Sequence, residues 1–410
     1  CFKRNLKQEI KVAQLAGYTA ECTNYHHGEK NLMDTIVGMA SDIVGTNNIP
    51  LLYRDGMFGT RLEGGHDAAN GRYIFTRMEA IVPRVFDDAD TNVIEYAIDD
   101  GDVVEPVYFA PVVPMILVNG CAAGIGTGWS SSVPCYNPRT IVRAVRAWLE
   151  SPSKPRYPTF TPWYRGFKGR VESVNSTTYQ TIGVFTRTEN GRVHVTELPI
   201  GMWTNKFKEL LSTLELKKMV KSVVNHSTPT AVDFTFVDDS GFISTYESLH
   251  LITAVNTRNL VLFDPNGKLV HYDTPGDVIT AYAQRRLEIY KGRRARLIEA
   301  ARQTILHVSN KVRFVVAITE ATLDISKLSS ARLNARLAAD GYAKHDGSYG
   351  YLTTLPMTSL TTDALSRYLK QQKELNRSVA RLSRMSATTM WKDDLTTFSD
   401  QLNADMGELK

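Results

Sequence analysis

The feature that most constrains the fold is a helical pattern that runs from Asp277 to about Glu320 without a proline. Gly292 is its only weak position, and a helix of this length is typical of a coiled-coil arm. Residues 363–385 repeat apolar side chains in alternating steps of three and four. The turn-rich string "YGYLTTLPMTSL" separates the two helices. The pattern therefore predicts an antiparallel arm with a compact knob at its tip.

Two shorter helical patterns and a glycine-rich segment lie near the start of the chain. Residues 7–17 have a small apolar face and end at Gly17, and a second pattern runs from Leu32 to Gly45. Two helices joined by a polar turn are consistent with a helix-turn-helix, although this pattern alone is weak. Residues 46–72 are rich in glycine and predict a loop.

The middle of the chain changes from a mixed region to a β-rich one. "PVVPMILVNGCAAGIGTGW" predicts an apolar strand that runs into a glycine-rich turn, and "NPRTIVRAVRAWLE" predicts an amphipathic helix. Residues 155–275 are rich in Thr, Val, Tyr and Phe, which predicts a mostly β domain. A chain of 410 residues is too long for one compact core, so several domains are expected.

Composition limits the class of protein. No uninterrupted apolar run reaches about 18 residues, so no transmembrane helix and no membrane partner are expected. The start, "CFKRNLKQEI", has no signal peptide and no Met, which suggests a fragment. Four cysteines without CxxC spacing predict reduced thiols of an intracellular protein. The net charge of +5 permits nucleic-acid binding without demonstrating it.

An arginine stands directly before a tyrosine in "NGRYIFT". Most tyrosines in a chain with 18 of them are structural, so a packed aromatic is the commoner role for Tyr73. A nucleophilic tyrosine would need assistance, because on the order of 0.1% of a phenol with a pKa of about 10 is ionised at pH 7. Arg72 could stabilise the charge that develops on an attacked phosphate, since loss of such a donor costs roughly 3 to 4 kcal/mol.

Ordered motifs along nearly the whole chain resemble the breakage-reunion region of eukaryotic-type DNA topoisomerase II, a type IIA enzyme. They include "KVAQLAGYTAE", "YHHGE", "GTRLEGG", "RYIFT", "VPMILVNG", "GIGTGWS", "ELP", "VLFD" and "YGYLTTLPMTSLT". The resemblance implies that Tyr73 is the nucleophile, which forms a transient 5′-phosphotyrosine link to DNA. It also implies that Arg72 stabilises the transition state.

The resemblance further implies an α+β multidomain fold. We expect a winged-helix DNA-binding and cleavage domain at 1–155, a β-rich tower at 156–275, and a coiled-coil arm with a helical dimerisation gate at 276–410. Two chains would form a homodimer through this gate, and each would cut one strand of double-stranded DNA. ATP would drive duplex passage, which relaxes or decatenates DNA. The ATP and Mg²⁺ sites of the family lie outside this region, so none is expected here.

The resemblance assigns further residues to DNA. Ile125 in "GIGTGW" would wedge between base pairs and bend the duplex, although a hydrophobic residue in a tight turn is the commoner explanation. Tyr25, His27 and Lys30 surround the start of the expected recognition helix, where a helix N-terminus would favour phosphate. The alternative for these three is a solvated polar turn.

Other candidates are weaker. Trp203 would lie along the DNA path, although such a residue is more often in a core, and Arg61 and His66 are assigned by position alone. The basic run "RRLEIYKGRRAR" is expected to be a solvated face of the coiled coil. The acidic strings at 87–90 and 99–102 could suggest a metal site. We reject that interpretation, because the family holds Mg²⁺ elsewhere.

Two rival classes remain open. An architectural DNA-bending protein would keep the fold without the chemistry, but it would not need a tyrosine at position 73. A coiled-coil scaffold would need neither the Arg-Tyr pair nor the glycine-rich loops. Met57 and Lys30 depart from cellular members and suggest a distant relative, such as one from a large DNA virus of the African swine fever type. The expected location is intracellular with the DNA: the nucleus for a cellular protein, and the host cytoplasm or nucleus for a viral one.

Overall fold

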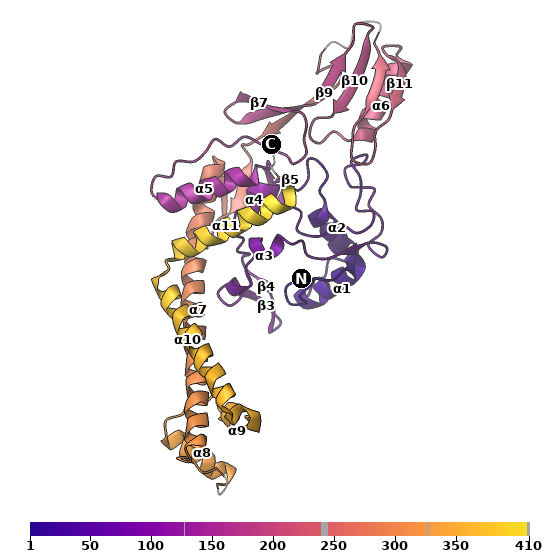
Figure 1. Ribbon diagram of the computed structural model, residues 1–410. Coiled ribbons are helices and arrows are strands. Elements are labelled where there is room, and N and C mark those ends of the chain that lie inside the picture. The colour runs from indigo at the N-terminus through magenta and orange to yellow at the C-terminus, as the bar shows by residue number, and fades with distance from the viewer. Residues whose placement is uncertain (127, 239–244, 326–327, 408–410) are drawn as a thin grey trace. The chain divides into compact units, whose positions relative to one another are not determined.

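The computed structural model describes residues 1–126, 128–238, 245–325 and 328–407 (Figure 1). Contacts divide the chain into two compact units. Unit 1 comprises Cys1–Asp88, Ile94–Arg286 and the chain from Lys392 onward, and unit 2 comprises Ala89–Val93 and Leu287–Trp391. Helices and antiparallel sheets both build the chain, which confirms the mixed α and β class. No helix in the described ranges is both long enough and apolar enough to cross a membrane.

Two helices near the N-terminus pack around a shared core with a short sheet. They are α1 (Val12–Thr23) and α2 (Glu29–Ala40), and the sheet pairs β1 (Ile10–Lys11) with β2 (Phe75–Thr76) in antiparallel register. The core consists of Leu6, Ile10, Val12, Leu15, Ala16, Ile36, Ala40, Leu52, Phe58 and Ile74. Because β2 begins two residues after Tyr73, the chain at Tyr73 is attached to this helix pair.

The predicted ends of both helices are wrong. Gly17 lies inside α1, where an isolated glycine is tolerated at a cost of about 1 kcal/mol. The helix ends instead at Asn24, which takes the left-handed conformation at φ 50°. Helix α2 ends at Ala40 rather than at Gly45, because the Asn47 side chain donates to two carbonyls at the helix end, at 2.7 and 2.9 Å.

The segment predicted as an apolar strand is partly a helix, α4 (Met115–Asn119). A short buried apolar run does not distinguish the two, and Pro114 and Gly120 bound the helix here. A hairpin follows, formed by β5 (Cys121–Gly126) and β6 (Trp129–Val133). The predicted amphipathic helix is confirmed as α5 (Pro138–Glu150), capped by the Asn137 side chain. The remaining elements are α3 (Val82–Val85), the 3-10 helix η1 (Asp88–Asp90), β3 (Tyr96–Asp99) and β4 (Asp102–Pro106).

Antiparallel sheets dominate residues 170–272, which confirms the β-rich prediction. A four-stranded sheet has the order β11-β12-β10-β9, a three-stranded sheet the order β13-β8-β7, and β14 pairs with β15. Helix α6 (Thr204–Leu216) packs on the four-stranded sheet, and its Phe207 and Leu211 are buried against Phe234 and Phe236. The strands are β7 (Arg170–Asn175), β8 (Thr178–Ile182), β9 (Val184–Arg187), β10 (Arg192–Glu197), β11 (Lys221–Asn225), β12 (Phe234–Val237), β13 (Ile252–Asn256), β14 (Leu260–Phe263) and β15 (Leu269–Tyr272).

Most of the long helix predicted for the arm lies in unit 2, together with its partner helix and the turn-rich knob. Helix α7 (Pro275–Thr319) has 45 residues, which makes it about 68 Å long. It packs antiparallel to α10 (Thr362–Arg384): Gln372 donates to Ser309 at 2.5 Å, and Arg294 donates to the Leu382 carbonyl at 3.0 Å. The knob contains α8 (Ser330–Ala339), α9 (Gly350–Thr353) and the 3-10 helix η2 (Met357–Leu360), around a core of Phe314, Leu323, Leu337, Tyr342, Tyr349 and Leu352.

Two details of the arm differ from the prediction. Gly292 is a close contact rather than a weak position, because an added Cβ would lie 2.5 Å from the Val93 side chain. The last helix, α11 (Ala387–Met406), belongs mostly to unit 1. There it lies beside α5, with hydrogen bonds to Arg139 and Arg146 at 2.8 and 2.7 Å. The predicted region 276–410 therefore does not form one compact unit.

Candidate nucleic-acid interface

Tyr73 lies on a turn whose backbone is held from two sides. Its side chain is 77% exposed, whereas Ile74 beside it is 1% exposed in the core. The Tyr73 N–H donates to the Asn70 carbonyl at 2.9 Å. Two N–H groups from the first turn of α1 donate to the carbonyls of Ile74 and Gly71, at 3.0 and 2.9 Å. The phenol is therefore presented to solvent from a well-supported backbone.

Arg72 is exposed beside Tyr73. Its N–H donates to the Asn70 side-chain oxygen at 3.1 Å. Within the described part of the chain, no carboxylate forms an ion pair with its guanidinium. An exposed phenol and an available guanidinium on adjacent residues can approach one phosphate together, because the cation neutralises the oxygens while the phenol approaches phosphorus.

The loop before Tyr73 folds back on itself. Thr60 donates to the Asp67 carboxylate from its N–H at 2.8 Å and from its hydroxyl at 2.6 Å. Burial acts to raise the pKa of Asp67, but these hydrogen bonds outweigh it and lower the pKa below its ordinary value. Gly59, at φ 91°, lies against Gly65 so closely that an added Cβ would be 2.5 Å from the Gly65 Cα.

We expect Gly59→Ala to lower the free energy of unfolding by more than about 2 kcal/mol. The positive φ costs an alanine roughly 1 to 2 kcal/mol, and the methyl group would overlap backbone atoms. Gly17→Ala is the matched control, since an added Cβ there meets nothing within 4 Å. It should stabilise α1 by up to about 1 kcal/mol. Urea denaturation measures both, and equal midpoints for the two variants would contradict the packing argument.

The residues predicted around the recognition helix surround the start of α2. The Tyr25 hydroxyl accepts a hydrogen bond from Asn31 at 2.7 Å, and its ring meets His27 edge to face at 5.3 Å. Lys30 pairs with Asp34 at 2.6 Å, and both side chains are exposed. An exposed pair of this kind contributes only about 0.3 to 0.5 kcal/mol, so Lys30 can readily exchange Asp34 for a phosphate.

The β5–β6 hairpin carries two exposed apolar side chains. Ile125 is 84% exposed and pairs with Ser130 across the hairpin, and Trp129 is 61% exposed. The motif "GIGTGW" predicts a DNA contact for Ile125 but does not by itself point to Trp129, which stands in the same motif. The signal that could have found Trp129 is its position, because a second large apolar residue at a glycine-rich turn has little core to enter. Two large apolar groups exposed on one hairpin make it a candidate contact surface.

A groove of about 1300 Å³ lies in unit 1 between α2, the glycine-rich loop, the β5–β6 hairpin and the start of α6. Lys30, His66 and Trp203 come from distant parts of the sequence and all line it. Asn70 and Gly71, just before Tyr73, line it as well. The groove therefore brings together three residues that the sequence predicted separately. Tyr25, His27 and Ile125 lie outside this lining.

Trp203 is half-buried at the start of α6. An added Cβ on Gly64, at φ 63°, would lie 2.1 Å from the Trp203 ring. The glycine therefore allows the loop to pass across the indole. Gly64 and Trp203 both line the groove.

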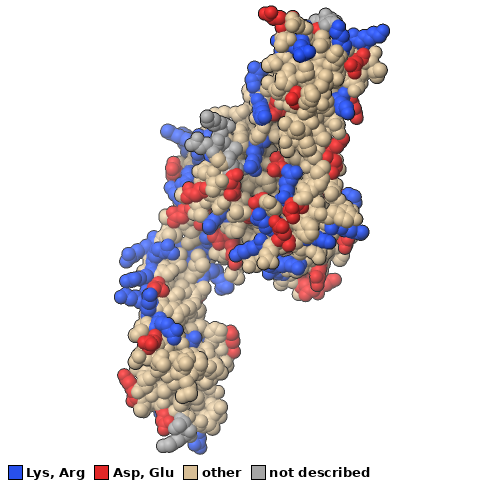
Figure 2. Space-filling model, turned by 45° about the vertical axis from the view of Figure 1, so that its right-hand side comes forward, with Lys and Arg blue, Asp and Glu red and all other residues tan. Residues whose placement is uncertain are grey.

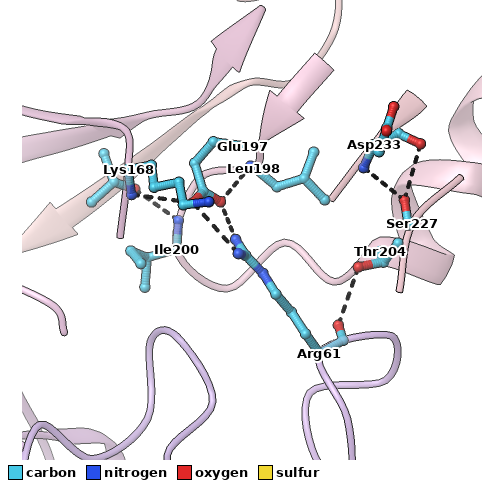
Figure 3. A network of polar contacts seen from close by, with 9 residues as sticks. Arg61, Lys168, Glu197, Leu198, Ile200, Thr204, Ser227 and Asp233 are labelled. Atoms are coloured by element: carbon cyan, nitrogen blue, oxygen red, sulfur yellow. Dashed lines mark hydrogen bonds and ion pairs between the residues drawn. The ribbon is translucent and has the colours of Figure 1, made fainter. Parts of the chain in front are cut away.

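Arg61 is buried, which does not favour the predicted contact with DNA; that contact stays a prediction. It is 7% exposed, and its guanidinium forms an ion pair with Glu197, which is 1% exposed (Figure 3). Glu197 also accepts the N–H groups of Leu198 and Lys168, at 2.9 and 3.1 Å. The Arg61 N–H donates to the Pro229 carbonyl at 2.8 Å. Arg61 thus joins the glycine-rich loop to the end of β10.

The acidic strings at 87–90 and 99–102 contact neighbouring side chains. Asp90 is buried and lies 3.8 Å from Arg293, and Asp99 accepts a hydrogen bond from Asn24 at 3.2 Å. Among the residues that the structure describes, no group of three or more His, Cys, Asp or Glu side chains could hold a metal ion. The donor groups described here therefore do not fit a Mg²⁺ site.

Comparison with known proteins shows the family. Residues 1–396 match the family model for the A-type subunit of DNA gyrase/topoisomerase IV, and the chain belongs to this family. DNA topoisomerase 2 of Plasmodium falciparum is 35% identical in an alignment over 439 residues, and the alignment covers 96% of this chain and 31% of that protein. DNA topoisomerase 2 of Invertebrate iridescent virus 6 is 34% identical over 398 residues, which cover 95% of this chain and 34% of that protein.

A solved structure agrees with these relatives. The crystal structure of the Plasmodium falciparum topoisomerase II DNA-binding, cleavage and re-ligation domain superimposes with a TM-score of 0.93 at 35% identity. The match covers 100% of this chain and 61% of that one. The resemblance to eukaryotic-type DNA topoisomerase II is confirmed. The chain spans about a third of the length of these two curated relatives.

Proposed function

We propose that this chain is the DNA-binding and cleavage core of an ATP-dependent type II DNA topoisomerase. The observation that carries the proposal is the exposed Tyr73 beside the exposed Arg72, on a turn held by the first turn of α1. The relatives named DNA topoisomerase 2 support this proposal. The complete enzyme would pass one duplex through a transient double-strand break and thereby relax or decatenate DNA.

The chemistry is an exchange of one phosphate diester for another. The Tyr73 oxygen forms a bond to phosphorus as the bond to the 3′ oxygen breaks. The phenolic proton leaves to a base, and the 3′ oxygen takes up a proton and becomes a hydroxyl. Because the phosphotyrosine link is itself a diester, the reverse attack by the 3′ hydroxyl reseals the strand. Arg72 would stabilise the negative charge that develops on the phosphate oxygens.

Mg²⁺ and ATP would be bound outside the described residues. Mg²⁺ would increase the electrophilicity of the phosphate. The residues described here supply no carboxylate cluster for it, so each role that we assign to this chain concerns DNA and the nucleophile.

The groove in unit 1 would receive the duplex that is cut. Lys30 and Trp203 line it, and Tyr25 and His27 lie at the start of the same helix as Lys30. Lys30 would contact phosphate, while Ile125 would enter the base stack and bend the duplex. Such a wedge costs a few kcal/mol of unstacking and gains contact with the wrapped DNA. Trp129, close to Ile125 on the hairpin, would contribute to the same contact.

We further propose the family's architecture for this chain. Residues 1–155 would act as a winged-helix domain, residues 156–275 as a tower, and the knob of the arm as a dimerisation gate. Two chains would meet there across a twofold interface. The expected location is with DNA inside the cell, in the nucleus for a cellular protein and in the host cytoplasm or nucleus for a viral one. A viral source stays a prediction.

The dimer proposal can be tested at Met357 in the knob, which is 86% exposed. We expect Met357→Asp to weaken self-association roughly tenfold or more, because a charge would replace an apolar contact at an interface centre. Leu216 on α6 is equally exposed, at 86%, and Leu216→Asp is the matched control. Sedimentation velocity over a concentration series measures the association. A wild-type chain that remains monomeric, or equal effects of both variants, would argue against a gate at the knob.

The cleavage proposal is tested by covalent capture. The chain is combined with the metal-binding segment of a relative, Mg²⁺ and a nicked duplex whose cleaved strand is labelled at its 3′ end, because the 5′-phosphotyrosine link retains the fragment downstream of the cut. After a detergent quench, a protein-linked labelled strand is expected. A protein that bends DNA but forms no link under these conditions would favour the architectural alternative.

A further inference from the structure

A row of basic side chains runs along α10 of the arm. Its members are separated by three, four, four and three residues, which places them on one face of the helix. All of them are exposed. The row is about 21 Å long at 1.5 Å per residue. We call it the basic stripe, and it consists of Lys370, Lys373, Arg377, Arg381 and Arg384.

The packing of the arm does not require the basic stripe. Gln372 contacts Ser309 of α7, Tyr368 lies 6.0 Å from the Lys311 ammonium of α7, and both residues fall on the opposite side of α10. Among the described residues, no carboxylate forms an ion pair with a member of the stripe. Glu374 and Asp363, the acidic residues of α10, also lack such a pair with it. The positive charge of the stripe is therefore not neutralised by a carboxylate among the described residues.

The stripe differs from an ordinary solvated helix face. Surfaces that only provide solubility intersperse both signs of charge, because like charges at helical spacing repel. Here one sign predominates along about four turns. Figure 2 shows Lys and Arg side chains gathered on the arm toward its end away from the knob. On α7, Lys291, Arg296 and Arg302 are exposed as well.

We propose that the basic stripe binds the phosphate backbone of a second DNA duplex, distinct from the duplex cut at Tyr73. This inference rests on the proposed function, which brings a second duplex past the protein. One DNA strand presents a phosphate about every 3.4 Å along the axis, so the stripe can span about six phosphates. Contacts to phosphate alone are independent of sequence. Binding that is independent of sequence suits a duplex that passes through the enzyme and is then released.

The test measures DNA affinity of the full chain against salt concentration, by anisotropy of a labelled duplex about two helical turns long. The stripe variant carries Lys373→Gln, Arg377→Gln and Arg381→Gln. The matched control removes the same charge from exposed residues elsewhere, with Lys154→Gln, Arg156→Gln and Arg332→Gln. A groove variant carries Lys30→Gln and His66→Gln, since both residues line the groove.

We expect two binding phases in the wild-type chain, a tight one and a weak one. The stripe variant should weaken only the weak phase, by tenfold or more, and reduce its log–log salt slope by up to about 2.7. The groove variant should weaken only the tight phase, and the matched control neither. The inference is overturned if the weak phase is missing, if the matched control weakens it equally, or if the stripe variant weakens only the tight phase. If the tight phase is missing, the proposed function fails. The proposal for the basic stripe is then still tested by comparing the weak phase of the stripe variant with that of the matched control.

Discussion

Tyr73→Phe is expected to abolish the covalent link to DNA and to leave DNA affinity within about twofold of wild type. The substitution removes the attacking oxygen and nothing else, because the ring is 77% exposed and fills no core. For the same reason the free energy of unfolding should change by less than about 0.5 kcal/mol. Covalent capture measures the link, and anisotropy measures the affinity.

Two substitutions at Arg72 test how much its guanidinium contributes to link formation. Arg72→Ala should slow link formation by about 10² to 10³-fold, because a donor to the developing phosphate charge is lost. Arg72→Lys should recover part of the rate, since an ammonium supplies charge without the paired geometry of the guanidinium. If Tyr73→Phe still forms a link, another residue is the nucleophile. If Arg72→Ala weakens only DNA affinity, Arg72 binds DNA in the ground state rather than in the transition state.

Arg61→Ala is expected to lower the free energy of unfolding by about 3 to 5 kcal/mol. It would leave the Glu197 carboxylate, which is 1% exposed, buried without its cation. Replacing both residues, with Arg61→Met and Glu197→Leu, should cost much less than the sum of the single variants. Urea denaturation followed by tryptophan fluorescence measures these free energies.

The exposed ion pair of Lys30 and Asp34 serves as a comparison for the buried pair described above. Asp34→Ala should cost only about 0.3 to 0.5 kcal/mol, since both side chains are largely in water. Among folded molecules, Arg61→Ala should also leave the salt slope of DNA affinity unchanged. A slope that falls by about 0.9 would mean that Arg61 contacts a phosphate after all.

Several elements could be predicted because their signal is local. The long helix α7, its partner α10 and the amphipathic helix α5 all follow from apolar periodicity. Helix ends were less predictable. Gly17 is a plausible stop by residue type, but α1 continues to Thr23, and a side chain from Asn47 helps to end α2. The apolar run at Met115–Asn119 became a helix because burial on several sides removes the period that distinguishes strands from helices.

The candidate site likewise has features that the sequence predicts and features that it does not. The Arg72–Tyr73 pair and the Ile125 motif could be named from residue order, although their roles in DNA cleavage still need the experiments above. Their exposure could not be inferred, because it depends on where the neighbouring core lies. Trp129 was missed, since the chain alone does not reveal which aromatic residues remain outside a core.

The helical arm, the β-rich middle region and the family follow from the sequence, because periodicity and motif order are encoded within short stretches. The burial of Arg61 depends instead on the tertiary fold, since its partner Glu197 lies 136 residues away in the chain. The same holds for the groove, which collects Lys30, His66 and Trp203 from three separate segments. Which distant groups meet is set by the packing of whole elements, and no local pattern records that packing.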